Sequence, residues 1–267
     1  MSTEVQPLSR PALEAVPGVL GAIALERLAD YSGTVVGPAG AVEGAGAFED
    51  ALRAPGLSVI AEVKRASPSQ GHIRDLDPVA TAREYETGGA AAISVLTEPR
   101  RFGGELAHLQ DVTRTVSVPV LRKDFTVHPA QVAEASAAGA SAVLLIVALT
   151  LQHTRAWIEL AARFGLAALV EVHDEDELGI ALDAGARVIG VNNRDLRTLR
   201  IDLETAPKLC GRARAAGFTG VLVAESGYST AAELRALPDG IDAVLIGTSL
   251  TGSGSPGAAL KDILTGR

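Results

Sequence analysis

Residues 137–147 read AAGASAVLLIV, and this stretch carries the pattern that decides the fold. A helix-like segment reaches Gly139, two residues follow, and an aliphatic run begins at Ala142. Glycine in this place is free to adopt the left-handed conformation that ends a helix. The run that follows is continuous rather than alternating, which is typical of a parallel strand buried on both faces. The stretch therefore predicts a helix that leads directly into a buried strand.

The same unit recurs along the chain, in ETGGAAAISVL (86–96), RFGLAALVEV (163–172), DAGARVIGV (183–191), AAGFTGVLVAES (215–226) and PDGIDAVLIG (238–247). With the runs in LSVIAEV and VSVPVLRKDF, eight strands are predicted, at 57–63, 91–96, 118–121, 142–147, 167–170, 188–191, 220–224 and 243–246. Eight strand–helix units in about 250 residues favour an α/β fold, a (β/α)8 TIM barrel. A doubly wound open sheet is the alternative, but no G-x-G-x-x-G follows the first strand.

Several helix starts are also marked in the sequence. Proline suits the first helical position, and a polar residue before it can cap the helix. The predicted starts are Asp77 before Pro78, His128 before Pro129, Ser255 before Pro256, and a capping box of Thr230 with Glu233.

Residues 1–50 lie outside the eight units. The segment VLGAIALERLADY (19–31) predicts one amphipathic helix, and GPAGAVEGAGAFED (37–50) indicates a flexible connector. We expect 1–50 to form an N-terminal helical extension and connector, packed on a catalytic barrel domain made by 51–267.

The composition excludes several classes of function. The 267 residues carry a formal charge of −8 with 3% aromatics, so neither a basic patch nor a stacking platform for nucleic acid is expected. Cys210 is the single cysteine, which excludes an intrachain disulfide and favours a reducing compartment. No signal peptide is recognisable, and the longest strongly apolar run, 142–151, is too short to span a bilayer. We expect a soluble, cytoplasmic protein without a nucleic-acid or membrane partner.

Polar side chains gather where the predicted strands end, which is where barrels of this kind place their active sites. A single charge there is usually a solvated edge or an ordinary ion pair, but this many in one place predict an active site. Glu62 and Lys64 lie two residues apart, so both point to the barrel interior. The full set is Glu62, Lys64, Lys123, Glu171, Asn192, Arg194, Glu225, Ser226, Gly227, Gly247 and Thr248.

Lysine is rare in this chain, with four lysines against twenty arginines. Lys64 and Lys123 both belong to the strand-end set. Arginine does not readily give up a proton, whereas an ammonium in a partly desolvated site near another cation can have its pKa lowered. The two lysines therefore predict proton chemistry or a compact positive charge.

Glycine-rich turns follow the seventh and eighth strands, in AESG (224–227) and IGTSLTGSGSPG (246–257). Backbone N–H groups converge in such turns, which predicts a phosphate site. The histidines show no ligand spacing, and His173 in HDEDE is interpreted as part of a solvated helix start. No metal site is predicted.

Seven motifs together resemble one family of barrel enzymes. They are IAEVKRASPSQG (60–71), ISVLTEPRRFGG (93–104), PVLRKDF (119–125), ALVEVH (168–173), GVNNRDL (190–196), VAESG (223–227) and IGTSL (246–250). In order and spacing, over 48–260, the chain resembles indole-3-glycerol-phosphate synthase, a lyase of tryptophan biosynthesis. Related phosphate-binding barrels share the last motifs but not the first and third.

The resemblance implies a substrate and a reaction. The substrate is 1-(2-carboxyphenylamino)-1-deoxyribulose 5-phosphate, an anionic sugar phosphate with an aromatic carboxylate. The indole ring closes with loss of CO₂ and water, without a cofactor or metal.

The resemblance also implies roles for residues of the strand-end set. Lys123 matches the general acid, Glu171 a base or stabiliser of the developing anilinium, and Lys64 with Glu62 a pair near the substrate carboxylate that is also proposed for dehydration. Which group acts at which step is left open. The remaining matches are catalytic Asn192 and Ser226, substrate-binding Arg194 and Glu225, apolar walls Phe102 and Phe125, and a phosphate cradle of Lys64, Ser67, Gly227, Gly247 and Thr248.

The sequence departs from the family pattern at two places, and two alternative functions remain open. The N-terminal segment is more apolar and glycine-rich than is typical of the family, and Gln70 stands where lysine is frequent. A Schiff-base aldolase acting through Lys123 or Lys64 is one alternative function, and a non-catalytic barrel that binds a sugar phosphate is the other. The sequence leaves the oligomeric state and any association with pathway enzymes open.

Overall fold

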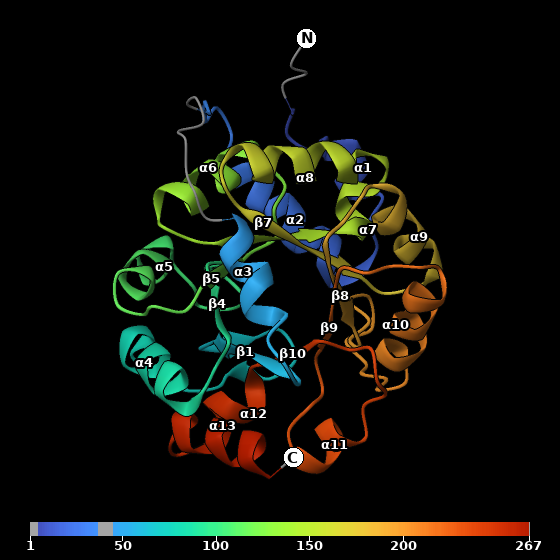
Figure 1. The fold of residues 1–267 in the computed structure, drawn as a ribbon. Coiled ribbons are helices and arrows are strands. Elements are labelled where there is room, and N and C mark those ends of the chain that lie inside the picture. Colours follow the sequence, from blue (N-terminus) through green and yellow to red (C-terminus); the bar gives the residue numbers. More distant parts are fainter. Residues whose placement is uncertain (1–4, 37–44, 267) are drawn as a thin grey trace.

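The structure is a computed structural model that describes residues 5–36 and 45–266. Eight parallel strands close into a barrel, because each pairs with the next barrel strand and β10 returns to pair with β1. The predicted (β/α)8 barrel is therefore confirmed, with its helices arranged around the outside (Figure 1). The barrel strands are β1 (Ser58–Val63), β4 (Ala92–Leu96), β5 (Val120–Lys123), β6 (Ala142–Ile146), β7 (Ala167–Val172), β8 (Val188–Asn192), β9 (Val221–Glu225) and β10 (Ala243–Ile246).

Four of the outer helices begin where the sequence predicts. Asp77 caps the helix that opens with Pro78, and both His128 with Gln131 and Thr230 with Glu233 form capping boxes. Ser255 precedes a further helix that opens with proline. The outer helices are α4 (Pro78–Gly88), α5 (Leu106–Thr113), α6 (Pro129–Ala137), α8 (Thr154–Arg163), α9 (Glu175–Asp183), α10 (Thr205–Ala215), α11 (Ala231–Arg235) and α13 (Pro256–Thr265). Shorter elements are α7 (Val147–Thr150), η1 (Leu151–His153), α12 (Thr248–Thr251), β2 (Ala66–Ser67) and β3 (Gly71–His72).

Four strands run further than predicted, and each carries a polar residue at or next to its last position. Lys123, Asn192 and Glu225 are the last residues of β5, β8 and β9, and Glu171 is the next to last of β7. Asn192 lies opposite Glu225 in the β8–β9 register, so the ladder continues through both. The polar side chains find partners inside the barrel, and the strands therefore do not need to stop before them.

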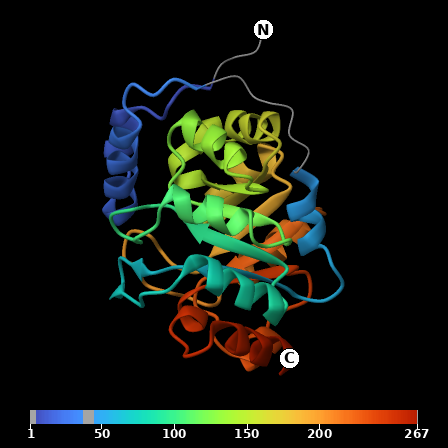
Figure 2. The ribbon, with the colours of Figure 1, turned by 90° about the vertical axis from the view of Figure 1, so that its left-hand side faces the viewer.

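The segment before β1 packs on both ends of the barrel. Helices α1 (Arg10–Glu14) and α2 (Gly18–Asp30) lie at one end and α3 (Ala45–Leu52) at the other, as Figure 2 shows. The helix predicted over 19–31 is confirmed as α2. The connector predicted over 37–50 is wrong for 45–50, which belong to α3, and 37–44 lie outside the described residues. Helix α3 forms there because Phe48 and Leu52 become fully buried against the barrel.

The core is aliphatic, as the shortage of aromatic residues requires. The interior strands are buried along nearly their whole length, with burial shared among Val, Ile, Leu and Ala. Cys210 is buried in this core. Within residues 5–36 and 45–266, no helix combines the length and apolar character that a membrane crossing requires.

Candidate active site

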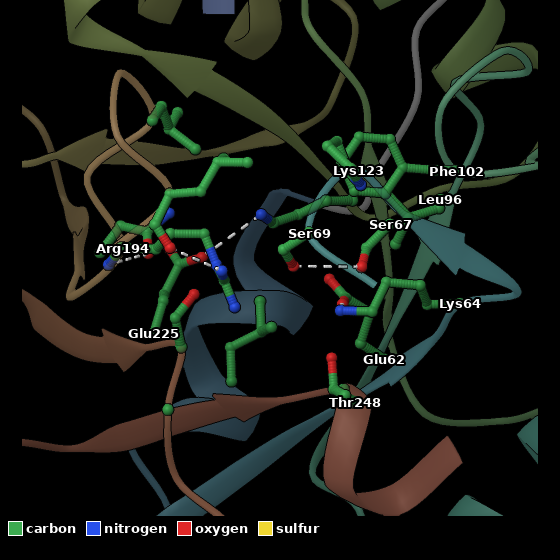
Figure 3. Close-up of a pocket in the computed structure, with 18 of the residues that line it drawn as sticks. Glu62, Lys64, Ser67, Ser69, Leu96, Phe102, Lys123, Arg194, Glu225 and Thr248 are labelled. Carbon is green, nitrogen blue, oxygen red and sulfur yellow. Dashed lines mark hydrogen bonds and ion pairs between the residues drawn. The ribbon is translucent and has the colours of Figure 1, made fainter. Parts of the chain in front are cut away.

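A cavity of about 310 Å³ lies at the carboxyl ends of the strands, and Figure 3 shows its lining. Every residue that the sequence predicted for the site lines this one cavity. The structure brings together residues from seven separate motifs, which are Glu62, Lys64, Ser67, Phe102, Lys123, Phe125, Glu171, Asn192, Arg194, Glu225, Ser226, Gly227, Gly247 and Thr248.

Glu62 and Lys64 form a close ion pair on one side of the cavity. The Lys64 Nζ lies 2.6 Å from the Glu62 Oε1, and both side chains are nearly buried. Burial opposes ionisation of Glu62, but the ammonium groups of Lys64 and Lys123 outweigh it and hold the pKa of Glu62 below its usual value. A Cβ at Gly247 would collide with the Glu62 carboxylate and lie 2.9 Å from the Lys64 Nζ. Gly247 therefore leaves room for this ion pair.

Lys123 lies between two carboxylates of other strands. Its Nζ is 3.4 Å from the Glu171 Oε2 and 3.4 Å from the Glu225 Oε2. Burial would lower the pKa of Lys123, but Glu171, Glu225 and Glu62 together raise it above its usual value. The expectation of a lowered lysine pKa is therefore wrong for Lys123, because the charges that face it are carboxylates. Lys123 is held as an ammonium, which is the form that donates a proton.

The two carboxylates beside Lys123 have pKa values displaced in opposite directions. Burial and the charges of Glu171 and Glu62 raise the pKa of Glu225. Burial also opposes the ionisation of Glu171, but Lys123 and a neighbouring histidine hold its pKa below the usual value. The Glu225 Oε1 is buried without a hydrogen-bond partner among the described residues, in space left by Gly190, where a Cβ would collide with it. Of the two carboxyl groups, Glu225 is therefore the more readily protonated and Glu171 the more readily ionised.

That histidine is His173, which the motif HDEDE predicted to be part of a solvated helix start. This interpretation is wrong, because α9 begins at Glu175 with Asp174 as its cap, and the His173 side chain is only 14% exposed. Its Nε2 lies 3.3 Å from the Glu171 Oε1, and its Nδ1 lies 2.9 Å from the Glu177 Oε2. A signal was present: EVH repeats the spacing of EVK at 62–64, which places both polar side chains on one face.

The turns after β9 and β10 line the cavity with Ser226, Gly227, Gly247 and Thr248. Ser226 and Gly227 both have left-handed backbone angles, with φ of 67° and 96°. Such a conformation is unusual for serine and marks a locally strained turn. A Cβ on Gly227 would lie 2.6 Å from a Leu203 methyl group, so this position also needs glycine for space. Consecutive residues of this kind can direct N–H groups at an anion.

One side of the cavity is apolar. The rings of Phe102 and Phe125 lie 5.9 Å apart between centroids. Helix α2 adds Val19, Leu20 and Ile23 to the same lining. The sequence did not indicate this contribution, because the helix is separated from the strand motifs by the segment before β1.

The loop after β8 carries two further predicted residues. The Asn192 Oδ1 accepts a hydrogen bond from the Arg194 backbone N–H at 3.0 Å, so Asn192 shapes the start of the loop. The Arg194 Nη1 donates to the Leu199 carbonyl at 3.0 Å, which leaves its other N–H groups for a ligand in the cavity.

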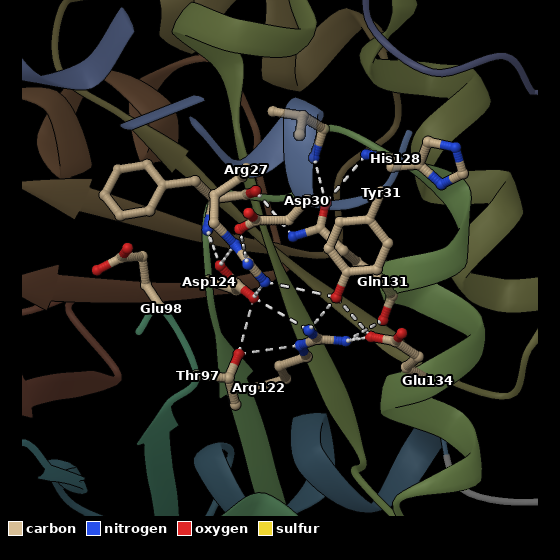
Figure 4. A network of polar contacts seen from close by, with 12 residues as sticks. Arg27, Asp30, Tyr31, Thr97, Glu98, Arg122, Asp124, His128, Gln131 and Glu134 are labelled. Atoms are coloured by element: carbon tan, nitrogen blue, oxygen red, sulfur yellow. Dashed lines mark hydrogen bonds and ion pairs between the residues drawn. The ribbon is translucent and has the colours of Figure 1, made fainter. Parts of the chain in front are cut away.

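Helix α2 is fixed over the cavity by a second buried group of charges, drawn in Figure 4. The Arg27 Nη2 lies 2.7 Å from the Asp124 Oδ2, and Arg122 binds the same oxygen at 3.0 Å. Arg122 also contacts Tyr31 at 3.1 Å, and the Tyr31 hydroxyl donates to Glu134 at 2.6 Å. We call these five residues the latch. Asp124 directly follows Lys123, so the latch joins the helix to the strand that carries the ammonium.

The other end of α2 rests on the loop after β8. Gly18 has a φ of 76°, and a Cβ there would lie 2.9 Å from the Arg197 Cα. The helix therefore contacts the barrel at two places on opposite sides of the cavity, at Gly18 and at Arg27.

The arrangement combines proton donors and acceptors with binding groups for two unlike ends of one ligand. Ammonium groups and backbone N–H groups suit an anion, and the phenylalanine side suits an aromatic ring. Within the described part of the chain, no group of three or more His, Cys, Asp or Glu side chains is placed to hold a metal ion.

Comparisons with known proteins agree with this geometry. A family model described as indole-3-glycerol phosphate synthase matches residues 35–263. A Deinococcus radiodurans protein named indole-3-glycerol phosphate synthase is 53% identical over 262 residues, which are 96% of this chain and 98% of the relative. A Mycobacteroides abscessus protein of the same name is 52% identical over 222 residues, covering 80% of this chain and 79% of the relative.

Solved structures support the fold independently. A crystal structure of KGPDC from Streptococcus mutans matches with a TM-score of 0.60 and 12% identity, covering 79% of this chain and 97% of that one. Thiamine phosphate pyrophosphorylase from Pyrococcus furiosus matches with a TM-score of 0.57 and 18% identity, covering 79% and 94%. At these identities the likeness concerns the barrel alone.

Proposed function

The chain belongs to the indole-3-glycerol phosphate synthase family, and from this premise we propose how its cavity carries out the reaction. The enzyme is a carboxy-lyase of tryptophan biosynthesis. It converts 1-(2-carboxyphenylamino)-1-deoxyribulose 5-phosphate to indole-3-glycerol phosphate, with loss of CO₂ and water. One observation carries the assignment of residues: the Lys123 Nζ lies 3.4 Å from a carboxyl oxygen of Glu171 and 3.4 Å from one of Glu225 in one cavity.

The two ends of the substrate bind at different sides of the cavity, the phosphate at the polar side and the aromatic ring at the apolar side. The phosphate lies against Lys64, Ser67, and the turns at Gly227 and 247–248, where backbone N–H groups and an ammonium are available. The aromatic ring lies between Phe102, Phe125 and the α2 side chains. Arg194 takes the ring carboxylate, because a guanidinium matches that planar group.

Lys123 donates the proton that carbon–carbon bond formation requires. The ring carbon that bears the carboxylate attacks the ketone carbon, and the ketone oxygen becomes a hydroxyl by taking a proton. A positioned donor of this kind contributes about 10²–10⁴ in rate. Loss of CO₂ then restores the aromatic ring.

Dehydration needs a second acid and a base. The new hydroxyl leaves as water after it is protonated, and we assign this proton to the Lys64 ammonium, which Glu62 holds in place at 2.6 Å. Glu171 is ionised and accepts the proton that the closing ring loses. Glu225, the carboxyl group whose pKa is raised, donates a hydrogen bond to the sugar in its protonated form, and Asn192 and Ser226 orient the same part of the substrate.

The direct test is to incubate the protein with the substrate and follow indole fluorescence. Ring closure by the wild type, with a loss of about 10²–10⁴ in kcat for Glu171→Gln, is expected. Borohydride treatment in the presence of substrate tests the Schiff-base aldolase: a trapped lysine adduct would support it. Lys123 as an ammonium argues against that alternative, because a Schiff base needs the free amine.

Three further proposals rest on the composition and order of the sequence. The substrate is an anionic small molecule, and a chain of charge −8 binds it only through local positive groups. The enzyme works in the cytoplasm, where its single cysteine stays reduced. Residues 1–50 act as an extension of a catalytic domain over 51–267, and neither nucleic acid nor membrane is a partner.

A further inference from the structure

We propose that His173 is a positioning residue, which holds the Glu171 carboxylate in its working orientation through a charged bridge from Glu177. The inference rests on the base role proposed above for Glu171. His173 itself does not belong to the cavity lining, so it acts through its neighbour rather than on the substrate.

Each oxygen of Glu171 faces one cation. The Oε2 accepts a hydrogen bond from the Lys123 Nζ at 3.4 Å, whereas the Oε1 lies 3.3 Å from the His173 Nε2 in an ion-pair contact without hydrogen-bond geometry. Glu171 is 1% exposed, so no bulk water competes for either oxygen. The carboxylate therefore lies between two cationic groups, with one beside each oxygen.

The imidazole is anchored from its other side. The His173 Nδ1 lies 2.9 Å from the Glu177 Oε2, and the same oxygen accepts the His173 backbone N–H at 2.9 Å. Glu177 is in turn fixed by α9, because its backbone N–H donates to the Asp174 Oδ1 at 2.9 Å. The start of α9 needs only the carboxylate and the backbone N–H. It does not require that the imidazole Nε2 face Glu171.

The surroundings keep the imidazole charged. Burial would favour the neutral ring, but Glu171 and Glu177 outweigh it and raise the pKa of His173 to about 10. Glu171 on β7 and Glu177 on α9 contact the ring directly. The charged groups that line the same hollow as His173 are Asp174, Glu175 and Asp176 at the start of α9, Asp202 and Glu204 before α10, and Lys208 on α10. Further out, Lys123 and Asn192 interact with Glu171, and Arg197 interacts with Asp174 and Glu177. Carboxylates outnumber the cations among them, which favours an imidazolium at neutral pH.

The bridge matters because Glu171 has competing partners. Lys123 also attracts Glu225, and Glu62 adds a third carboxylate to the same space. Without a cation at position 173, Glu171 would turn towards Lys123 and take up a proton more readily. Both changes would remove an ionised base from the substrate.

The experiment compares His173→Gln, which is neutral but keeps a donor, with the control His153→Gln on an exposed histidine outside the cavity. For His173→Gln we expect kcat to fall about 10- to 100-fold with KM little changed. We also expect the acid limb of the kcat–pH profile to move to higher pH, because Glu171 has lost a neighbouring cation. His153→Gln should match the wild type in both.

Two further measurements separate positioning from a merely structural role. In Glu177→Gln the imidazole stays beside Glu171 but loses one carboxylate, so its pKa falls and kcat should drop on the alkaline side of the profile. Nitrogen NMR of the wild type at pH 8 should report His173 as an imidazolium, whether or not His173→Gln folds. The proposal would be overturned if the His173 imidazole is neutral at pH 8. It would also be overturned if the acid limb of the kcat–pH profile of His173→Gln lies at the same pH as in the wild type. If Glu171→Gln keeps full activity, the proposed base role of Glu171 is wrong. If Glu171→Gln loses activity but His173→Gln keeps it, only the positioning role of His173 is wrong.

Discussion

Two buried groups of charges, the latch and the charges around Lys123 in the cavity, are neighbours in this barrel and differ in how completely they are hydrogen-bonded. In the latch, the Asp124 Oδ2 accepts from Arg27, Arg122 and Thr97 within 2.7–3.0 Å, and the Oδ1 accepts from Arg27 at 3.0 Å. In the cavity, Lys123 lies 3.4 Å from its two nearest carboxylates, and one oxygen of Glu225 has no partner among the described residues. Lys123 therefore belongs to a group of charges that is incompletely hydrogen-bonded, whereas its neighbour Asp124 belongs to a group that is fully hydrogen-bonded.

The difference separates two uses of buried charge. A fully hydrogen-bonded carboxylate keeps a fixed protonation state: burial opposes the ionisation of Asp124, but Arg122 and Arg27 hold its pKa below the usual value. An incompletely hydrogen-bonded group keeps donors and acceptors that can bind a substrate, and its protonation state can change. Buried charges that lack full hydrogen bonding reduce stability, and they are expected at functional sites, where that loss is tolerated.

The largest expected effect is on catalysis at Lys123. Lys123→Arg keeps the charge between Glu171 and Glu225 but replaces a compact proton donor by a guanidinium that does not give up its proton. We expect kcat to fall about 10²–10⁴-fold with little change in the denaturant midpoint. Near wild-type turnover by this variant would remove the proton donor from the mechanism.

The next effect is on stability at the latch. Arg27→Met leaves Asp124 buried with one cation fewer, and breaking a buried pair in this way costs about 3–5 kcal/mol. KM should rise as well, because α2 carries Leu20 and Ile23 into the cavity.

Arg101→Met is the matched control for the latch. It breaks the 2.8 Å pair of Arg101 with Glu26, in which both side chains are about one-third exposed. Such pairs contribute about 0–1 kcal/mol. Equal losses for the Arg27 and Arg101 variants in urea titrations would show that the latch is an ordinary surface contact.

A smaller effect, with a definite pH dependence, is expected at Glu225. Its pKa is raised in the folded state, so its contribution to stability is present below the usual glutamate pKa and is lost as the pH rises towards the folded value. Glu225→Gln should therefore gain about 1 kcal/mol at neutral pH, and nothing near pH 4. Denaturant midpoints across that range measure the gain; a constant difference would contradict the raised pKa.

The smallest change in stability is expected for the double variant Glu62→Gln with Lys64→Met. It removes both charges of a nearly buried pair at similar volume, and such replacements are often neutral or stabilising. The variant should be as stable as the wild type or more so, with almost no activity. A loss above about 2 kcal/mol together with retained activity would make the pair structural.

Sequence patterns predicted the barrel and the residues that line the cavity at its mouth, because both depend on local signals. Glycine-ended helices mark each strand, and a charge at a strand end has a known direction in a closed barrel. Pairings between distant segments left no such signal, as for Arg27 with Asp124, which lie 97 residues apart. Helix α3 was missed because its stability comes from burying Phe48 and Leu52, and its own composition resembles a loop.

The two supports of α2, at Gly18 and Arg27, have a consequence for how the chain is made. A helix of 13 residues is marginal by itself in water. At about 5–20 residues per second on the ribosome, α2 waits about 5–20 s for Asp124 to be synthesised, and longer for Arg197. During that time Leu20 and Ile23 have no cavity to line. A segment made before the barrel is thus among the last to reach its native place, and nascent chains that stall before residue 197 should leave it open to proteases.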